Sequence, residues 1–354
     1  MKILYVAQQY DYGDPARGLS FEHCNFYDSL KNMDHGTHEI VYFPFDQVAG
    51  RLGVAQMNER LLETAFREKP NLCFFFLVSD VVSKETVQNI TASGLVTCNW
   101  FADDHWRFDN FSKYWAPVFT FAITTDADAF LKYQKNSQKN IIKSQWGVNH
   151  FFYKKSDLSK KYDVTFVGQP HSGRKRLVGQ LKKAGIAVEC FGRGWPNGRV
   201  SQQEMINIFN QSKINLNFSN ASGQINATSV AKVFFKKDAR GRVLLESPAR
   251  WLKNAKSVVS AITKHQIKAR NFEITGCGGF LLTGYASHLE DYYVIGKEIV
   301  CFTDTDSLVK KIRHYLSNDS ERQSIAMAGY ERTIRTHTYQ QRFKEIFKTM
   351  GLLT

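Results

Sequence analysis

The sequence predicts an α/β protein with two Rossmann-like domains, each a parallel sheet covered by helices on both faces. Apolar runs of strand length alternate with segments of helical periodicity, as in repeated strand–helix units. The alternation stops at a polar, lysine-bearing stretch, residues 153–160, and then restarts. The run 72–78 is apolar throughout, which is typical of a central parallel strand buried on both faces.

The first series predicts an N-terminal Rossmann-like domain over residues 1–152. Its expected strands are 2–7, 39–45, 72–78, 95–100, 118–124 and 141–144, and its expected helices are 21–33, 61–67, 83–92, 111–115 and 126–133. Residues 153–160 then form the expected linker.

The second series predicts a C-terminal Rossmann-like domain over residues 161–338, with a basic insertion at 222–264. Its expected strands are 164–167, 187–191, 214–218, 280–282 and 299–302, and its expected helices are 174–184, 202–211, 307–316 and 321–337. A further short helix begins near Glu273. We expect the last helix, within 339–354, to cross back to the first domain. Ligands of such sheets bind at the carboxyl ends of the strands, so the cleft between the domains is the expected site.

Composition indicates a globular protein of the cytoplasm. Hydrophobic residues make up 43% and charged residues 23% of the 354 positions. No apolar run approaches the roughly 18 residues needed to cross a bilayer, and the first run turns polar at Gln8, too early for a signal peptide. The six cysteines show no C-x-x-C spacing, as expected for thiols in a reducing compartment.

The formal net charge of +14 predicts an anionic partner. Nucleotide-sugars, anionic lipid surfaces and nucleic acid are the candidate classes. Much of the excess is local, because residues 232–270 hold eleven Lys or Arg and two acids, a balance of +9.

Residues 268–283 combine features of a clamp for a nucleoside diphosphate. Lys268 and Arg270 precede a short helix, whose free N–H groups and dipole favour anions. Glu273, one turn into the helix, can accept hydrogen bonds from the vicinal hydroxyls of a ribose. The helix ends in a glycine-rich turn, Gly278 and Gly279, before a buried strand. The alternative interpretation is a capped helix with a glycine stop.

This segment resembles CgeB-like (spore-maturation-protein-like) glycosyltransferases, relatives of the retaining GT-B group. The similarity is carried by Arg270-Asn271-Phe272-Glu273, the Gly-Gly turn, Gly296-Lys297-Glu298-Ile299-Val300, Ile325-Ala326-Met327-Ala328-Gly329, His337-Thr338-Tyr339 and Arg342. It covers residues 160–347 well and the first half loosely. The resemblance implies a GT-B fold and places Glu273 at the second of two glutamates, the one that contacts the donor ribose. His265 stands where the first would be, which leaves retention or inversion of the anomeric centre open.

Two further strand–helix junctions of the second domain are candidate donor sites. In 166–176, a strand and a Gly turn precede a helix that opens with three cations, of which Arg174 is the candidate diphosphate ligand. The resemblance places the nucleotide base in the loop 191–200, with Gly192, Arg193 and Gly198 as candidates. The alternative for 166–176 is a helix whose first turn is simply solvated. The alternative for 191–200 is a turn in which glycine is needed only for a positive φ.

The first domain holds the candidate acceptor side. Asp103, Asp104 and His105 follow the fourth expected strand, so one of them can supply a general base for an acceptor hydroxyl. The sequence does not decide which one, and an N-cap role for either aspartate is the alternative. In the early loop, Gly18 and Glu22 occupy the place where GT-B enzymes carry a glycine loop near the transferred sugar.

The segment 250–264 predicts an amphipathic helix. Its apolar positions and its lysines fall on different faces; the apolar ones are Trp251, Leu252, Ala255, Val258, Val259 and Ile262. It either touches an anionic membrane or packs against the second domain with its lysines solvated.

These features together predict a metal-independent glycosyltransferase that moves a sugar from a nucleotide-diphosphate donor to an unidentified acceptor. Protein cations take the place of a metal, and no cofactor is expected. One alternative is a non-catalytic nucleotide-sugar-binding protein. The other is a nucleic-acid-binding or modifying protein that uses Lys236, Lys237, Arg240 and Arg242; we expect nucleic acid to be the less favoured partner.

Overall fold

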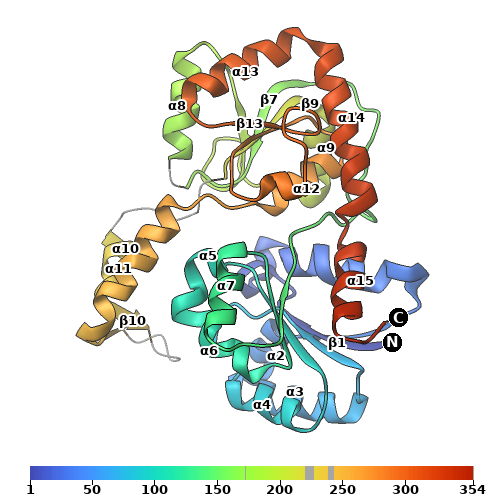
Figure 1. The fold of residues 1–354 in the computed structure, drawn as a ribbon, viewed down its shortest axis with the longest axis vertical. Coiled ribbons are helices and arrows are strands. Elements are labelled where there is room, and N and C mark those ends of the chain that lie inside the picture. The colour runs from blue at the N-terminus through green and yellow to red at the C-terminus, as the bar shows by residue number, and fades with distance from the viewer. Residues whose placement is uncertain (172, 220–226, 238–242, 354) are drawn as a thin grey trace. The chain divides into compact units, whose positions relative to one another are not determined.

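The computed structural model describes residues 1–171, 173–219, 227–237 and 243–353. The chain forms two compact units, each with its own parallel sheet and helices (Figure 1). The first unit comprises Met1–Gln145, Ala227–Ser260 and Tyr339–Thr354, and the second comprises Trp146–Asn226 and Ala261–Thr338. The predicted fold class, two α/β domains with parallel sheets, is confirmed.

The sheet of the first unit has six parallel strands in the order β2-β1-β3-β4-β5-β6. These are β1 (Lys2–Ala7), β2 (Glu39–Pro44), β3 (Leu72–Phe75), β4 (Thr97–Phe101), β5 (Phe121–Thr124) and β6 (Ile141–Lys143). Every residue of β3 and β4 is buried, as expected for strands covered on both faces. The order reverses between β1 and β3, so a crevice is expected where the loops after these two strands diverge.

Helices complete the first unit. They are a π-helical turn (Glu22–Tyr27) that continues into α1 (Asp28–Asn32), then α2 (Phe45–Leu52), α3 (Val54–Glu68), α4 (Lys84–Ala92), α5 (Asp104–Arg107), α6 (Lys113–Trp115), α7 (Ala127–Lys135) and the C-terminal α15 (Tyr339–Thr349). Helix α15 belongs here because the Phe343 ring packs 5.5 Å from Phe26 and 5.7 Å from Phe74, centroid to centroid.

The sheet of the second unit has five parallel strands in the order β13-β12-β9-β7-β8. These are β7 (Tyr162–Val167), β8 (Glu189–Phe191), β9 (Ser212–Asn217), β12 (Leu281–Gly284) and β13 (Val300–Phe302). Its helices are α8 (Arg174–Lys183), α9 (Gln202–Gln211), α12 (Ala269–Gly276), α13 (Thr305–Ser317) and α14 (Asp319–Thr336). The order reverses between β7 and β9, which places the expected crevice beside the first turn of α8.

Besides the helix expected at 250–264, the basic insertion contains a helix and a hairpin that sequence periodicity did not predict. Helix α10 (Ala227–Phe234) leads into an antiparallel hairpin, β10 (Phe235–Lys237) and β11 (Val243–Leu245), and then into α11 (Pro248–Thr263). We call residues 227–237 and 243–263 the arm. Arg240 and Arg242 lie outside the described residues.

The arm corrects the expectation that the insertion belongs to the second domain. Its residues Ala227–Ser260 group with the first unit. Lys253 on α11 donates a hydrogen bond from Nζ to the hydroxyl of Tyr114, 3.1 Å away. An amphipathic pattern shows that a helix has an apolar face but not which neighbour covers it, which explains the wrong expectation. No helix in the described part of the chain has the length and apolar character needed to span a bilayer.

Candidate functional site

Three segments meet at the carboxyl edge of the second sheet. Helix α8 starts just after β7, and the backbone N–H of Gln266 donates to the carbonyl of Ser219, just after β9, over 2.9 Å. The chain then enters α12, so the first turn of α12 lies at this edge as well. Neither α8 nor α12 has a side-chain hydrogen bond at its N-cap. Both helix N-termini therefore favour an anion.

Arg174, the first residue of α8, is held at this edge with unused hydrogen-bonding capacity. One Nη donates to the carbonyl of Gln169 over 2.8 Å, and the guanidinium lies 5.4 Å from the centre of the Phe166 ring. Its buried Nε–H has no hydrogen-bond partner among the described residues. Burial and, to a smaller extent, the charge of Arg270 lower the pKa of Arg174 to about 10. Two mutually repelling cations with a buried free donor form a site suited to an anion.

Arg270 is fixed by Glu273, one turn further along α12. Its guanidinium donates to Glu273 Oε2 and lies 5.4 Å from the centre of the Phe209 ring. The other carboxylate oxygen, Oε1, accepts a hydrogen bond of 3.0 Å from the Tyr153 hydroxyl. Glu273 is only 2% exposed. A carboxylate has about four acceptor positions, so two stay available for ribose hydroxyls in the predicted role.

Lys268 and His171 complete the cationic group. Burial, and then the charges of Arg174 and Lys268, lower the pKa of His171. The neutral form of the imidazole is therefore favoured more than in a free histidine, so the positive charge of the group comes from the lysine and the two arginines. Together with Arg270, these side chains concentrate positive charge at two helix N-termini. Such a site can bind a diphosphate and stabilise the negative charge that develops on it as a leaving group.

The predicted base-binding loop follows β8. The N–H of Gly192 donates to the carbonyl of Gly198 over 2.6 Å, which closes the loop, and Trp195 donates from Nε1 to the carbonyl of Gly168 over 2.8 Å. Arg193 is exposed on it. The loop is thereby attached to the turn between β7 and α8. The base-binding role stays a prediction.

Replacing Gly192 with alanine should destabilise the protein. Its φ is +134°, and an added Cβ would lie 2.5 Å from the carbonyl oxygen of Gly168. We expect a loss of roughly 1–3 kcal/mol in the free energy of unfolding, because the strained backbone and the clash act together. Urea unfolding of the variant measures this loss. The matched variant Gly198→Ala, where φ is +65° and no atom lies within 4 Å of the added Cβ, should lose less.

Gly278 and Gly279 lie at the other end of α12, away from the cations. A Cβ on Gly278 would meet the Lys155 side chain at 2.9 Å, and one on Gly279 would meet the Asn215 amide at 2.8 Å. These glycines let the turn before β12 pack closely. Their place in the structure favours that packing role over the predicted donor contact.

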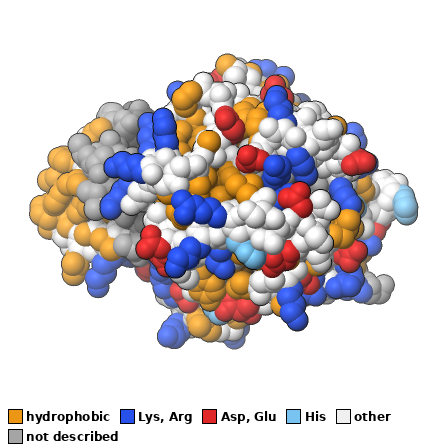
Figure 2. Space-filling view, turned by 90° about the horizontal axis from the view of Figure 1, so that it is seen from above, with side chains coloured by type: hydrophobic (Ala, Val, Ile, Leu, Met, Phe, Trp, Pro, Cys, Tyr) orange, Lys and Arg blue, Asp and Glu red, His pale blue; other side chains and the backbone are white. Residues whose placement is uncertain are grey.

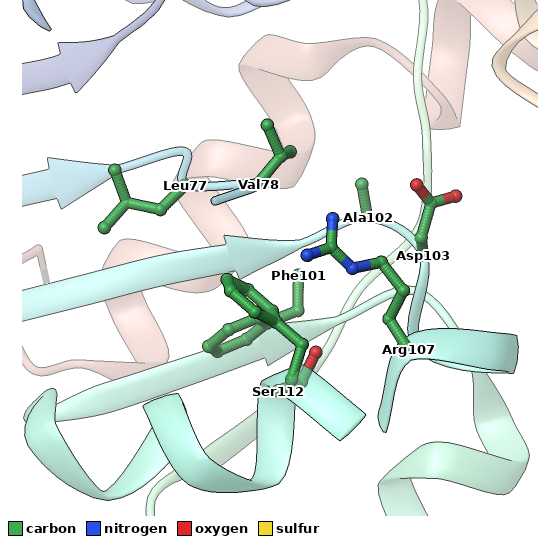
Figure 3. Close-up of a pocket in the computed structure, with 8 residues that line it drawn as sticks. Leu77, Val78, Phe101, Ala102, Asp103, Arg107 and Ser112 are labelled. Atoms are coloured by element: carbon green, nitrogen blue, oxygen red, sulfur yellow. The ribbon is translucent and has the colours of Figure 1, made fainter. Parts of the chain in front are cut away.

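In the first unit, Asp103 and Arg107 line a pocket at the carboxyl ends of β3 and β4. They flank the short helix α5, with Asp103 at its N-cap and Arg107 at its last position (Figure 3). The Arg107 guanidinium lies 4.1 Å from the centre of the Phe111 ring. Burial lowers the pKa of Arg107, whereas the charges of Asp103, Asp104 and Asp80 raise it.

Glu22 is the first residue of the π-helical turn that follows the loop after β1, and the charge of Asp103 acts on it. Burial raises the pKa of Glu22 to about 7, its hydrogen bonds around Ser20 oppose that rise, and the charges of Asp11 and Asp103 add to it. Glu22 and Asp103, which the sequence predicted separately, thus lie within electrostatic range of each other. Neighbouring carboxylates of this kind can exchange a proton with a hydroxyl near neutral pH.

Gly18 lies in the loop after β1, just before Glu22, and has a φ of +78°. Its carbonyl accepts the N–H of Asp11 over 3.0 Å, which closes the loop. The glycine is needed for that backbone conformation. A contact of Gly18 with a sugar stays a prediction.

Asp104 and His105 are turned into the core of the first unit. Asp104 is 1% exposed, and its Oδ2 accepts a hydrogen bond of 3.0 Å from the Tyr133 hydroxyl. Burial raises the pKa of Asp104 to about 7. His105 is 5% exposed. The structure therefore favours Asp103 over its two neighbours as the group that meets an acceptor.

Sequence reasoning missed Tyr153 and Arg107 as site residues. Tyr153 fell in the expected linker and reaches Glu273 only through the fold. Arg107 could have been found, since it follows Asp103 by four residues and thus shares a helix face with it. No group of three His, Cys, Asp or Glu side chains among the described residues is arranged to hold a metal ion.

Comparisons with known proteins show what this chain is similar to. A family model described as glycosyl transferase-like matches residues 174–251 and 232–348. The spore protein CgeB of Bacillus subtilis (strain 168) is 22% identical over 230 residues. The resemblance to CgeB-like glycosyltransferases is confirmed. That match covers 62% of this chain and 64% of CgeB, less than two thirds of its length.

Solved structures extend the likeness to the whole fold. HepE from Anabaena in complex with UDP matches with a TM-score of 0.58 and 11% identity, over 100% of both chains. Sucrose-phosphate synthase from Thermosynechococcus elongatus matches with a TM-score of 0.62 and 9% identity, over 99% of this chain and 97% of the other. A glycosyltransferase from Rickettsia africae matches with a TM-score of 0.60 and 10% identity, over 99% and 98%. The predicted GT-B fold is confirmed.

Proposed function

We propose that the protein is a glycosyltransferase that moves a sugar from a nucleotide-diphosphate donor to a hydroxyl-bearing acceptor. The observation that carries this proposal is the cationic group at the second sheet, in which Arg174 and Arg270 repel each other beside two helix N-termini. The similarity to glycosyltransferases and the UDP bound in HepE support the same class of donor.

In this proposal the second unit holds the donor. Arg174 and Arg270, with Lys268, neutralise the diphosphate as it departs, which lowers the barrier to breaking the glycosidic bond. Glu273 keeps Arg270 in place and offers its remaining acceptor positions to the ribose. Tyr153 fixes the orientation of that carboxylate. No metal is proposed in this step.

The first unit supplies the acceptor side of the proposal. Asp103 accepts the proton of the acceptor hydroxyl as the hydroxyl oxygen bonds to the sugar, and Glu22 ionises more readily once the charge of Asp103 is neutralised. We place the enzyme in the cytoplasm, at the inner face of a membrane, because the segment 232–270 carries a local charge of +9. The acceptor can be a glycan, a lipid-linked sugar or a protein.

The donor proposal predicts stabilisation by one nucleoside diphosphate. We expect UDP, the ligand of HepE, to raise the midpoint of thermal unfolding. A ligand at 100 times its Kd adds about 2.7 kcal/mol to the stability of the folded state. The measurement is thermal unfolding with UDP, GDP, CDP, ADP and dTDP in parallel.

Uridine and inorganic phosphate at the same concentrations serve as controls, because neither presents a diphosphate on a nucleoside. A shift with one diphosphate and none with the controls supports the proposal and identifies the base. The absence of a shift with all five diphosphates would contradict the proposed donor site.

A further inference from the structure

The arm exposes apolar side chains in a dense group. Of the 20 large hydrophobic side chains exposed in the described residues, seven fall within residues 230–259. They are Val230, Phe235, Val243, Leu244, Leu245, Leu252 and Val259. Figure 2 shows hydrophobic side chains gathered at its left, where the arm lies, next to residues drawn in grey. Contiguous exposed apolar surface of this kind marks an interaction site.

The exposure of these side chains does not mean that the arm lacks a core, because other side chains of the arm pack against one another in its interior. The Phe234 and Trp251 rings pack edge to face at 5.1 Å, and Trp251 donates from Nε1 to the carbonyl of Glu246 over 3.0 Å. Asn254 ties α11 to α10 through the carbonyl of Val233, 3.1 Å away. Trp251, expected on the same apolar face as Leu252, is thus directed into the interior of the arm.

The exposed residues follow the geometry of the hairpin and of α11. Phe235 pairs with Leu245 across the hairpin, and Val243 shares their face because it lies two residues away on the same strand. On α11, Leu252 (70% exposed) and Val259 (57% exposed) are seven residues apart and share one stripe. Lys256 is exposed between them, and Lys253 lies about 100° around the helix, on the side bound to Tyr114.

The positive charge of the arm indicates which kind of partner its exposed apolar surface binds. Residues 227–263 carry eight basic and two acidic residues, a balance of +6. A second copy of the chain would bring two such segments together, and their repulsion opposes a dimer. Nucleic acid would use the cations and leave the leucines and valines in water. A bilayer with anionic head groups uses both, since the cations meet the lipid charge and the apolar side chains enter the interface.

We propose that the arm docks the protein on an anionic lipid bilayer through the β10–β11 hairpin and the Leu252–Lys256–Val259 stripe of α11. This deepens the membrane contact in the proposed function and does not depend on the donor chemistry. Vesicle binding is measured without nucleotide, so failure of the docking surface and failure of the donor site are distinguishable.

The test is flotation of the full chain with vesicles of phosphatidylcholine alone or mixed equally with phosphatidylglycerol. We expect at least about tenfold stronger partitioning onto the anionic vesicles, and weaker partitioning in 0.5 M salt. The double variant Leu245→Ser, Leu252→Ser should lose about 100-fold, roughly tenfold for each leucine removed from the interface. Lys256→Gln should weaken binding a few-fold.

The matched controls are Leu131→Ser, on an exposed leucine of α7, and Lys139→Gln, on an exposed lysine of the first unit. Both should bind vesicles like the parent chain. Equal binding to neutral and anionic vesicles would overturn the proposal, as would full binding by the double-leucine variant. Duplex DNA binding or dimerisation through the arm, without vesicle binding, would overturn it in favour of those partners.

Discussion

Replacing Arg174 with glutamine should abolish the stabilisation by UDP without destabilising the free protein. The guanidinium is buried, repelled by Arg270 and left with an unused Nε–H, so its charge is unfavourable until an anion binds. Removing a buried cation from its phosphate partner costs about 2–5 kcal/mol of binding, or roughly 30-fold or more in Kd. Thermal unfolding of the variant, with and without UDP, measures both quantities.

Arg176→Gln is the matched control for this variant. It removes the same charge from the first turn of α8, but from an exposed position. We expect it to keep most of the UDP effect. A loss of stability in Arg174→Gln without ligand, together with an intact UDP shift, would assign Arg174 to the structure of the unit rather than to the donor site.

Replacing Asp103 with asparagine should lower the rate of sugar transfer about 100- to 10,000-fold, the range of a lost general base. Asp103 is the accessible carboxylate of its group, whereas Asp104 is bound to Tyr133 in the core. Nucleotide binding should not change, because the cationic group lies in the second unit. The measurements are UDP release from a UDP-sugar, with water in place of the acceptor, and the thermal shift with UDP.

Asp104→Asn gives the comparison on the adjacent residue. Its amide can still accept the Tyr133 hydrogen bond, so we expect the variant to fold and to release UDP at a rate close to that of the parent chain. A large loss of rate in Asp104→Asn and none in Asp103→Asn would reverse the roles that the structure favours for the two residues.

Part of the candidate site could be predicted because its signals are local. The run 268–276 carries Lys268, Arg270 and Glu273 within three helical turns, and the contact between Arg270 and Glu273 follows from their spacing of three residues. The contact of Tyr153 with Glu273 could not be predicted, since 120 residues separate them. Nothing in the local pattern of the expected linker distinguishes Tyr153 from its neighbours.

The arm also shows what a sequence pattern can and cannot predict. Helical spacing predicted an amphipathic segment at 250–264, and α11 occupies that place. The pattern could not show that Trp251 turns inward against Phe234 while Leu252 stays exposed, because adjacent apolar residues look equivalent until a neighbour covers one of them.

The sequence by itself determined the two parallel sheets, the order of their strands along the chain, and the concentration of positive charge, because periodicity and composition are properties of neighbouring residues. Only the tertiary structure decided that Arg174 and Arg270 lie close enough to repel each other, that Glu22 lies within electrostatic range of Asp103, and that Asp104 and His105 are buried. The first two findings involve residues that lie far apart in the chain. The third places adjacent residues differently, with Asp103 partly exposed and Asp104 and His105 in the core. Both outcomes depend on how the strands pair and which loops meet at the edge of a sheet.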